Sequence, residues 1–168
     1  MGKKIDNIAP TDLTSTYSKS YFEPGDLYDA TGTTYGNGRW VWGVYLQSAV
    51  TASVNVPCVQ LPSTTNQGIF TADVSDAYDP ETRQSIVFPA VTAVSAKYMW
   101  FKCQGFHIIK KNSASTLFAA YDPFRVTGDR TLSVCTTASM DSGYFLEAST
   151  AGTVDVDMKV WLHGRRYT

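Results

Sequence analysis

Residues 97–111, KYMWFKCQGFHIIKK, place three large aromatic side chains within five positions and then return repeatedly to apolar residues. In a strand, Tyr98 and Trp100 would lie on one face, and Met99 and Phe101 on the other, because successive side chains alternate. A strand of an antiparallel sheet commonly buries one face and leaves the other in water. Apolar groups on both faces therefore predict a second covering surface, which could be a crossing loop, the N-terminal part of the chain or another subunit.

The rest of the chain has the composition of an all-β protein. Thr, Ser, Val, Ala and aromatic residues dominate, whereas Glu, Lys and Leu are sparse. Residues 38–48, GRWVWGVYLQS, and residues 153–164, TVDVDMKVWLHG, alternate with a period of two, and other short apolar segments are separated by Gly, Asp or Ser. We predict a compact antiparallel β-sandwich, jelly-roll-like in form, or a small β-barrel.

Residues 1–37 differ from the rest because they are polar and rich in turn residues. They predict an extended N-terminal arm attached to a single all-β domain of residues 38–168. A free arm would normally lack large apolar side chains, yet this one carries Tyr17, Tyr21 and Phe22. The arm is therefore expected to lie against something, either its own domain or a neighbour.

Two shorter signals concern the core. Pro57 near the start of residues 55–61, NVPCVQL, predicts an edge or entry position and not a central one, because proline cannot donate to a sheet ladder. The three cysteines are odd in number and include no Cys-x-x-Cys pair, so we expect buried thiols made in a reducing compartment. They are Cys58, Cys103 and Cys135.

No catalytic or metal-binding arrangement is recognisable. The acidic segment 71–84, TADVSDAYDPETRQ, lacks the glycine and the regular spacing of a calcium loop. His107 and His163 have no local ligand partners, and Asp155 and Asp157 are typical of a solvated strand face. We expect neither enzymatic activity nor a cofactor or metal.

Charge and hydropathy limit the partners. The net charge is -1 and the basic residues form no stripe, which argues against nucleic acid. No apolar run has the length of a membrane span, and residues 1–13 lack the apolar core of a secretory signal. We expect a protein made in the cytoplasm with no membrane association.

Three segments, residues 97–111, 38–48 and 153–164, carry large apolar or aromatic residues on both faces, which predicts an interaction surface. The third segment is the last one, where Trp161 lies opposite Val160. The alternative is a thick core covered by loops, since aromatic residues dominate cores as well as interfaces. The residues predicted to contact other subunits are Tyr17, Tyr21, Phe22, Trp40, Trp42, Tyr98, Trp100 and Phe101.

The order of features from about residue 38 onward resembles small head decoration, or cement, proteins of tailed bacteriophages. The segments that carry the resemblance are GRWVWGVYLQSAVTA, KYMWFKCQG, YDPFRVTGDRTL and the terminal WLHGRR. In the middle segment Tyr98, Trp100 and Gly105 match the group's pattern, while Met99 replaces a glycine and Phe101 a valine.

The resemblance implies an all-β virion protein without an active site. Such a protein would bind the major capsid protein on the capsid exterior, after synthesis in the host cytoplasm, and would commonly form a small homo-oligomer, most often a trimer. Exposed Trp and Tyr could instead stack on sugars, as in a carbohydrate-binding module or the receptor-binding head of a virion. A small jelly-roll capsid protein that assembles a shell by itself is a further alternative.

Overall fold

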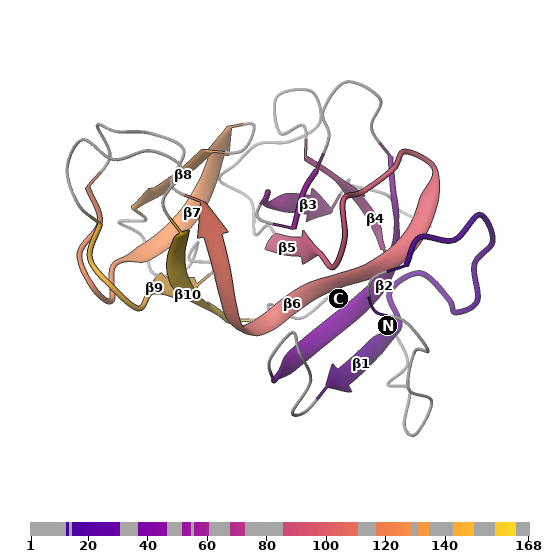
Figure 1. Cartoon of the computed structure of the whole chain (residues 1–168), viewed down its shortest axis with the longest axis horizontal. Coiled ribbons are helices and arrows are strands. Elements are labelled where there is room, and N and C mark those ends of the chain that lie inside the picture. Colours follow the sequence, from indigo (N-terminus) through magenta and orange to yellow (C-terminus); the bar gives the residue numbers. More distant parts are fainter. Residues whose placement is uncertain are drawn as a thin grey trace.

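The computed structural model describes Leu13 and residues 15–30, 37–46, 52–54, 56–60, 68–72, 86–110, 117–128, 131–134, 143–149 and 157–163. Ten strands and no helix lie within these residues, which confirms the all-β prediction (Figure 1). The strands are β1 Leu27–Ala30, β2 Gly38–Tyr45, β3 Cys58–Gln60, β4 Ile69–Thr71, β5 Ile86–Pro89, β6 Lys97–Lys110, β7 Pro123–Gly128, β8 Thr131–Val134, β9 Gly143–Phe145 and β10 Asp157–His163.

Five of these strands close into a small barrel. The strand order β2-β4-β3-β5-β6 is completed by antiparallel pairing of β2 with β6, and only the β2–β4 pair in this ring is parallel. β1 adds to the outside of the ring by pairing with β2, from Leu27 opposite Val41 to Ala30 opposite Gly38. The predicted small barrel is therefore present.

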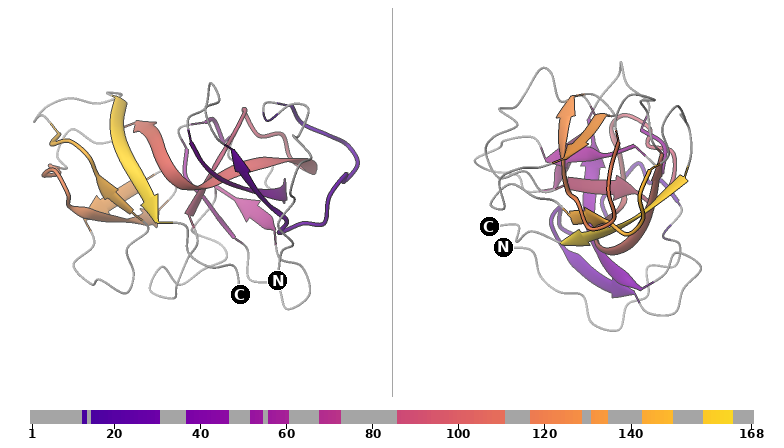
Figure 2. Two further views of the ribbon diagram at one scale, coloured as in Figure 1. Left: turned by 90° about the horizontal axis from the view of Figure 1, so that it is seen from below. Right: turned by 90° about the vertical axis from the view of Figure 1, so that its left-hand side faces the viewer.

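The second half of the sheet begins on β6, the long strand that also belongs to the barrel. The first part of β6 pairs with β2, and its last seven residues pair with β10, which continues through β9 and β7 to β8. The barrel and this second sheet lie at opposite ends of the long axis of the molecule (Figure 2). β6 therefore joins the two halves covalently and by its hydrogen bonds.

Gly105 marks the point where β6 leaves the barrel. Its φ is +99°, and a Cβ atom there would lie 2.8 Å from the carbonyl oxygen of Asn37. Residues other than glycine rarely adopt this backbone conformation. The sequence can turn from one sheet into the other at this position because no side chain is present.

Of the two positions predicted for Pro57, an edge strand or a strand entry, the structure shows the entry. β3 pairs with β4 on one side and with β5 on the other, so it is an internal strand of the barrel and not an edge strand. Pro57 comes one residue before Cys58, where β3 begins, and its missing N–H therefore lies outside the ladder.

Buried side chains form three clusters. The barrel interior contains Val41, Tyr45, Phe70, Met99, Phe101 and the free thiols of Cys58 and Cys103, which confirms the prediction of buried thiols at these two positions. A second cluster joins the barrel strands β3 and β5 to the second sheet. The third lies between the outer wall of the barrel and residues of the arm.

The alternation of β10 is as predicted within the described part of that segment. Met158, Val160 and Leu162 are buried in the cluster between the barrel and the second sheet, while Asp157, Lys159, Trp161 and His163 are exposed. The earlier residues of the predicted strand, 153–156, lie outside the described residues.

Candidate functional site

The arm is bound to the barrel wall by its backbone. Tyr17 and Tyr98 exchange two hydrogen bonds, each 2.9 Å long, on the edge of β6 that pairs with β5, beyond the end of β5. Trp42 makes two more with the arm, accepting from the N–H of Gly25 and donating to the carbonyl of Asp26, both at 2.8 Å. The described arm residues therefore continue the sheet across the boundary predicted at residue 37.

An aromatic cluster lies beneath the arm. The ring of Phe22 is 5.2 Å from that of Trp42 and 5.3 Å from that of Trp100, and the two tryptophan rings are 5.2 Å apart. The indole N–H of Trp42 donates to the hydroxyl of Ser20 at 2.9 Å. The second covering surface that residues 97–105 require is, in this chain, its own N-terminal arm.

The residues predicted to contact other subunits divide by burial. Four of them are no more than 2% exposed: Trp40, Trp42, Trp100 and Phe101. They form core within the chain, so the part of the prediction that assigned them to an intersubunit surface has no exposed area to support it. Phe101 faces the barrel interior, with its ring 4.5 Å from that of Phe70, whereas the three tryptophans face the arm.

The other four predicted residues lie at the periphery of the cluster. Tyr17, Phe22 and Tyr98 are half-buried, and their rings pack around Trp42. Tyr21 is 69% exposed, with one edge against the ring of Tyr17 at 5.1 Å. Of the eight, Tyr21 alone presents most of its ring to solvent.

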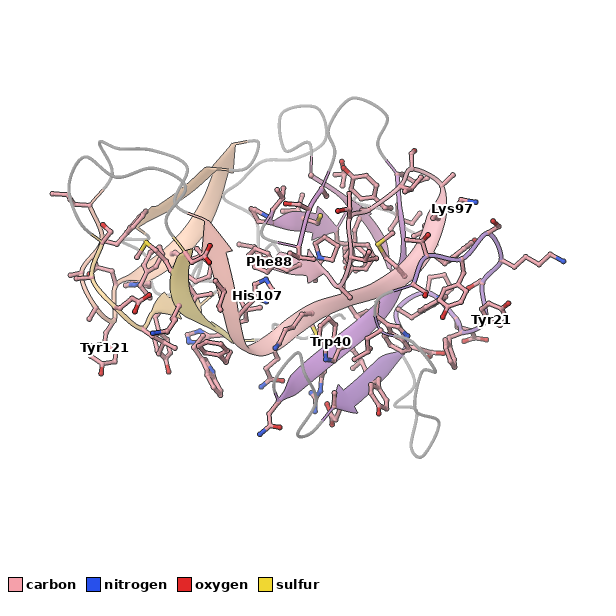
Figure 3. The ribbon with its side chains drawn as sticks, in the orientation of Figure 1. Tyr21, Trp40, Phe88, Lys97, His107 and Tyr121 are labelled. Atoms are coloured by element: carbon pink, nitrogen blue, oxygen red, sulfur yellow. The ribbon has the colours of Figure 1, made fainter. Side chains whose placement is uncertain are left out.

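We give the name arm end to three exposed apolar residues at one end of the barrel, Tyr21, Leu46 and Val94. Tyr21 lies at the end of the barrel where β6 begins, near Lys97 (Figure 3), whose ammonium contacts the hydroxyl of Ser18 in the arm. The turn before β6 presents Val94, 51% exposed, and the residue after β2 presents Leu46, 40% exposed. These two segments are adjacent because Tyr45 pairs with Lys97, and the carbonyl of Tyr45 accepts a hydrogen bond from the N–H of Ala96.

A second aromatic surface lies on the outer face of the second sheet. Trp161 on β10 stands directly opposite Phe106 on β6 and Tyr144 on β9, so the three side chains share one face of three adjacent strands. We name Phe106, Trp161 and Tyr144 the aromatic row. Trp161 is 40% exposed and its two neighbours are half-buried.

The surroundings of the row extend it toward the end of the molecule. The ring of Tyr121 lies 6.2 Å from that of Tyr144, and the imidazole of His163 meets Tyr144 edge-on at 5.4 Å. Tyr121 lies at the opposite end of the molecule from Tyr21 (Figure 3). Sequence reasoning identified Trp161 as an outward aromatic residue but missed its two neighbours, because strand register joins residues that are 17 and 55 positions away along the chain.

Two ionisable side chains lie near the junction of the barrel and the second sheet, Lys102 buried and His107 half-buried. Lys102 is 1% exposed, and its ammonium lies 5.3 Å from the ring centre of Trp40; burial lowers its pKa to about 8. Burial also lowers the pKa of His107 to about 4, although a hydrogen bond to the carbonyl of Val54 at 2.9 Å opposes the shift. The imidazole packs against Phe88 with ring centres 4.4 Å apart, and the two labelled side chains lie together between the halves of the molecule (Figure 3).

Neither ionisable group stands in a catalytic arrangement within the described residues. The ammonium of Lys102 lies over the ring of Trp40, and His107 packs against Phe88 and bonds to the carbonyl of Val54. No group of three or more potential metal ligands occurs in the part of the chain for which side chains are placed. The acids of segment 71–84, which are Asp73, Asp76, Asp79 and Glu81, lie outside that part, and so does Cys135.

Comparisons with known protein families, curated proteins and solved structures found no match. Among the described residues there is no helix of the length and apolarity that crossing a bilayer requires.

Proposed function

We propose that the protein is a capsid decoration protein of a tailed bacteriophage. It binds the outer surface of the assembled head and stabilises contacts between capsomers of the major capsid protein. The observation that carries the proposal is the arm end, where Tyr21, Leu46 and Val94 expose apolar surface on a barrel whose arm is held in place. The resemblance of the sequence to such proteins agrees with this assignment.

A docked arm suits binding to a lattice. Tyr17 before Tyr21, and Gly25 and Asp26 after it, already have backbone partners on the barrel, so the segment that carries Tyr21 is held at both ends before binding. Less conformational entropy is then lost on association, and more of the contact energy is available as affinity.

The stabilisation would arise by linkage. A protein that binds only the assembled lattice favours assembly by mass action, and many copies on one shell multiply a modest free energy for each site. A free homotrimer would add avidity, because one bound subunit raises the effective concentration of the others. We include the trimer in the proposal on the basis of the resemblance.

The test is co-sedimentation of the purified protein with undecorated heads of the phage that encodes it. We expect binding at a fixed stoichiometry, weakened by Tyr21→Ser at the arm end. Tyr121→Ser is the matched control, since Tyr121 is 74% exposed and lies at the opposite end of the molecule. Equal loss in both variants would contradict the assignment of the arm end, and a protein that ignores heads would overturn the function.

Sedimentation of the free protein tests the remaining alternative. A defined small oligomer agrees with the decoration role. Spontaneous formation of closed shells by the purified protein would instead favour the small self-assembling capsid protein.

A further inference from the structure

We propose that the aromatic row on the second sheet is a binding platform for neutral sugars. Phe106, Trp161 and Tyr144 stand in register on three adjacent strands and face outward, while the intervening side chains of the same strands point into the core. This site is separate from the arm end, and the inference does not depend on the function proposed above.

The chemistry of aromatic rings selects this ligand class. One face of a pyranose ring presents C–H groups with partial positive charge, which pack against the negative face of an aromatic ring. Trp161 offers the largest ring of the row and is 40% exposed, so a ligand can reach it without displacing core side chains. Adjacent strands are about 4.8 Å apart, which sets the three side chains next to one another along a short strip.

Sugar hydroxyls also need hydrogen-bonding partners beside the rings. His163 and Gln104 are a directly opposed pair on the same face, two residues along their strands from Trp161 and Phe106. The amide of Gln104 and the imidazole of His163 can each donate and accept, as a hydroxyl-bearing ligand requires. The phenol groups of Tyr144 and Tyr121 add two more groups of this kind.

The charges on this face favour a neutral ligand. Beside the row, Lys159 is paired with Glu147, with 3.4 Å between its ammonium and the carboxylate, and Asp157 lies one step further along β10. The aromatic end of the face, from Trp161 to His163, carries no Asp, Glu, Lys or Arg on β10. An anionic or cationic glycan would find no opposing charge in this part of the strand.

The dimensions of the row suit a short oligosaccharide. Three adjacent strands give a strip about 10 Å wide between the outer two. A few sugar rings match the strip, and a second copy of the chain is the competing occupant.

The distribution of tryptophans provides a direct readout. The chain has four, and Trp40, Trp42 and Trp100 are no more than 2% exposed, so quenching by a soluble agent reports mainly on Trp161. The probes are a glycan array, followed by titration with cellohexaose, chitohexaose and the best neutral hit. We expect a neutral oligosaccharide to shift the emission and to protect Trp161 from acrylamide.

Variants then locate the site by calorimetry. Trp161→Ala and Tyr144→Ala should each weaken sugar binding about tenfold or more, while Tyr21→Ala at the arm end leaves it unchanged. Unfolding curves must show each variant folded; Trp161→Phe, which keeps a ring, should retain most of the affinity. Failure of every neutral glycan to bind, binding of charged glycans alone, or conversion of a dimer to a monomer by Trp161→Ala would each overturn the proposal.

The two proposals can fail separately. If Tyr21→Ser loses head binding but still binds sugar, both proposals are supported. If the protein binds sugar but not heads, the decoration role is rejected and the sugar platform is retained. If it binds heads but no neutral sugar, the platform is rejected and the decoration role is retained.

Discussion

At the scale of single residues, His107 shows how a titratable group becomes part of a core. Its side chain stands opposite Val160 on the inner face of the second sheet and packs against Phe88. The charged form of an imidazole is disfavoured where water is excluded, and the ammonium of Lys102 disfavours it further. The fold therefore holds a neutral imidazole that links the barrel to the second sheet.

This burial predicts loss of stability in acid. The pKa of His107 is about 4 in the folded protein, whereas an unperturbed imidazole, as in the unfolded chain, has a pKa of 6.5. Between these two pH values the unfolded chain therefore binds a proton that the folded chain does not. Stability then falls as the pH falls through this interval, by about 1–3 kcal/mol in total. Urea unfolding measured across the interval should show this decline, and His107→Phe should remove it.

The other histidine provides the control for this experiment. His163 lies on the exposed face of β10, so His163→Gln should leave the acid decline in place. A decline that persists in His107→Phe, or that disappears in His163→Gln, would assign the effect to another group.

At the scale of elements, β6 was predicted well in one half only. The alternation of Tyr98 and Trp100 against Met99 and Phe101 follows from strand geometry, so a local pattern is enough to predict it. The transfer of the strand to a second sheet is not local, because it depends on the distant strand β10 that meets its last residues. Gly105 was the only local sign of that change.

The bend at Gly105 can be tested by adding a methyl group. Gly105→Ala combines a φ of +99° with a Cβ atom 2.8 Å from the oxygen of Asn37, and should cost about 1–3 kcal/mol of stability in urea unfolding. Ala96→Gly is the reciprocal control, because Ala96 already has a φ of +59° in an exposed turn. Its stability should change by less than about 1 kcal/mol, as relief of backbone strain offsets added chain entropy.

The arm was predicted to lie against its own domain or a neighbour, and its described residues lie against the barrel of the same chain. Composition alone leaves the partner open, since tryptophans on a strand favour any apolar cover. The decisive contacts, such as the pairing of Tyr17 with Tyr98, join residues 81 positions apart and leave no local trace. The same reason explains why the aromatic row was found only in part.

Removing one ring of the arm should loosen its packing. Phe22→Ala deletes contacts with both Trp42 and Trp100, and we expect a loss of about 1–3 kcal/mol and stronger quenching of tryptophan fluorescence by acrylamide. Tyr21→Ala, at the adjacent exposed position, should change stability by about 0.5 kcal/mol or less. Equal effects of the two substitutions would mean that the arm does not pack in solution as described.

At the scale of the whole molecule, the two halves share one core. Val59, Ile86 and Phe88 of the barrel strands belong to the same buried cluster as Val160 and Leu162 of the second sheet. β6 also crosses from one half to the other without interruption. The two surfaces proposed to bind partners are therefore fixed at the ends of one packed body.

A shared core predicts that the halves unfold together. Leu162→Ala in the second sheet removes a fully buried side chain and should cost about 2–5 kcal/mol. If the halves are one cooperative unit, fluorescence from Trp42 and Trp100 in the other half should follow the same shifted urea transition as circular dichroism of the strands. Val41→Ala inside the barrel should shift both signals together in the same way. Should Leu162→Ala leave the fluorescence transition at its original midpoint while part of the strand signal is lost earlier, the halves would be independent, and the second sheet could move relative to the arm end on the assembled particle.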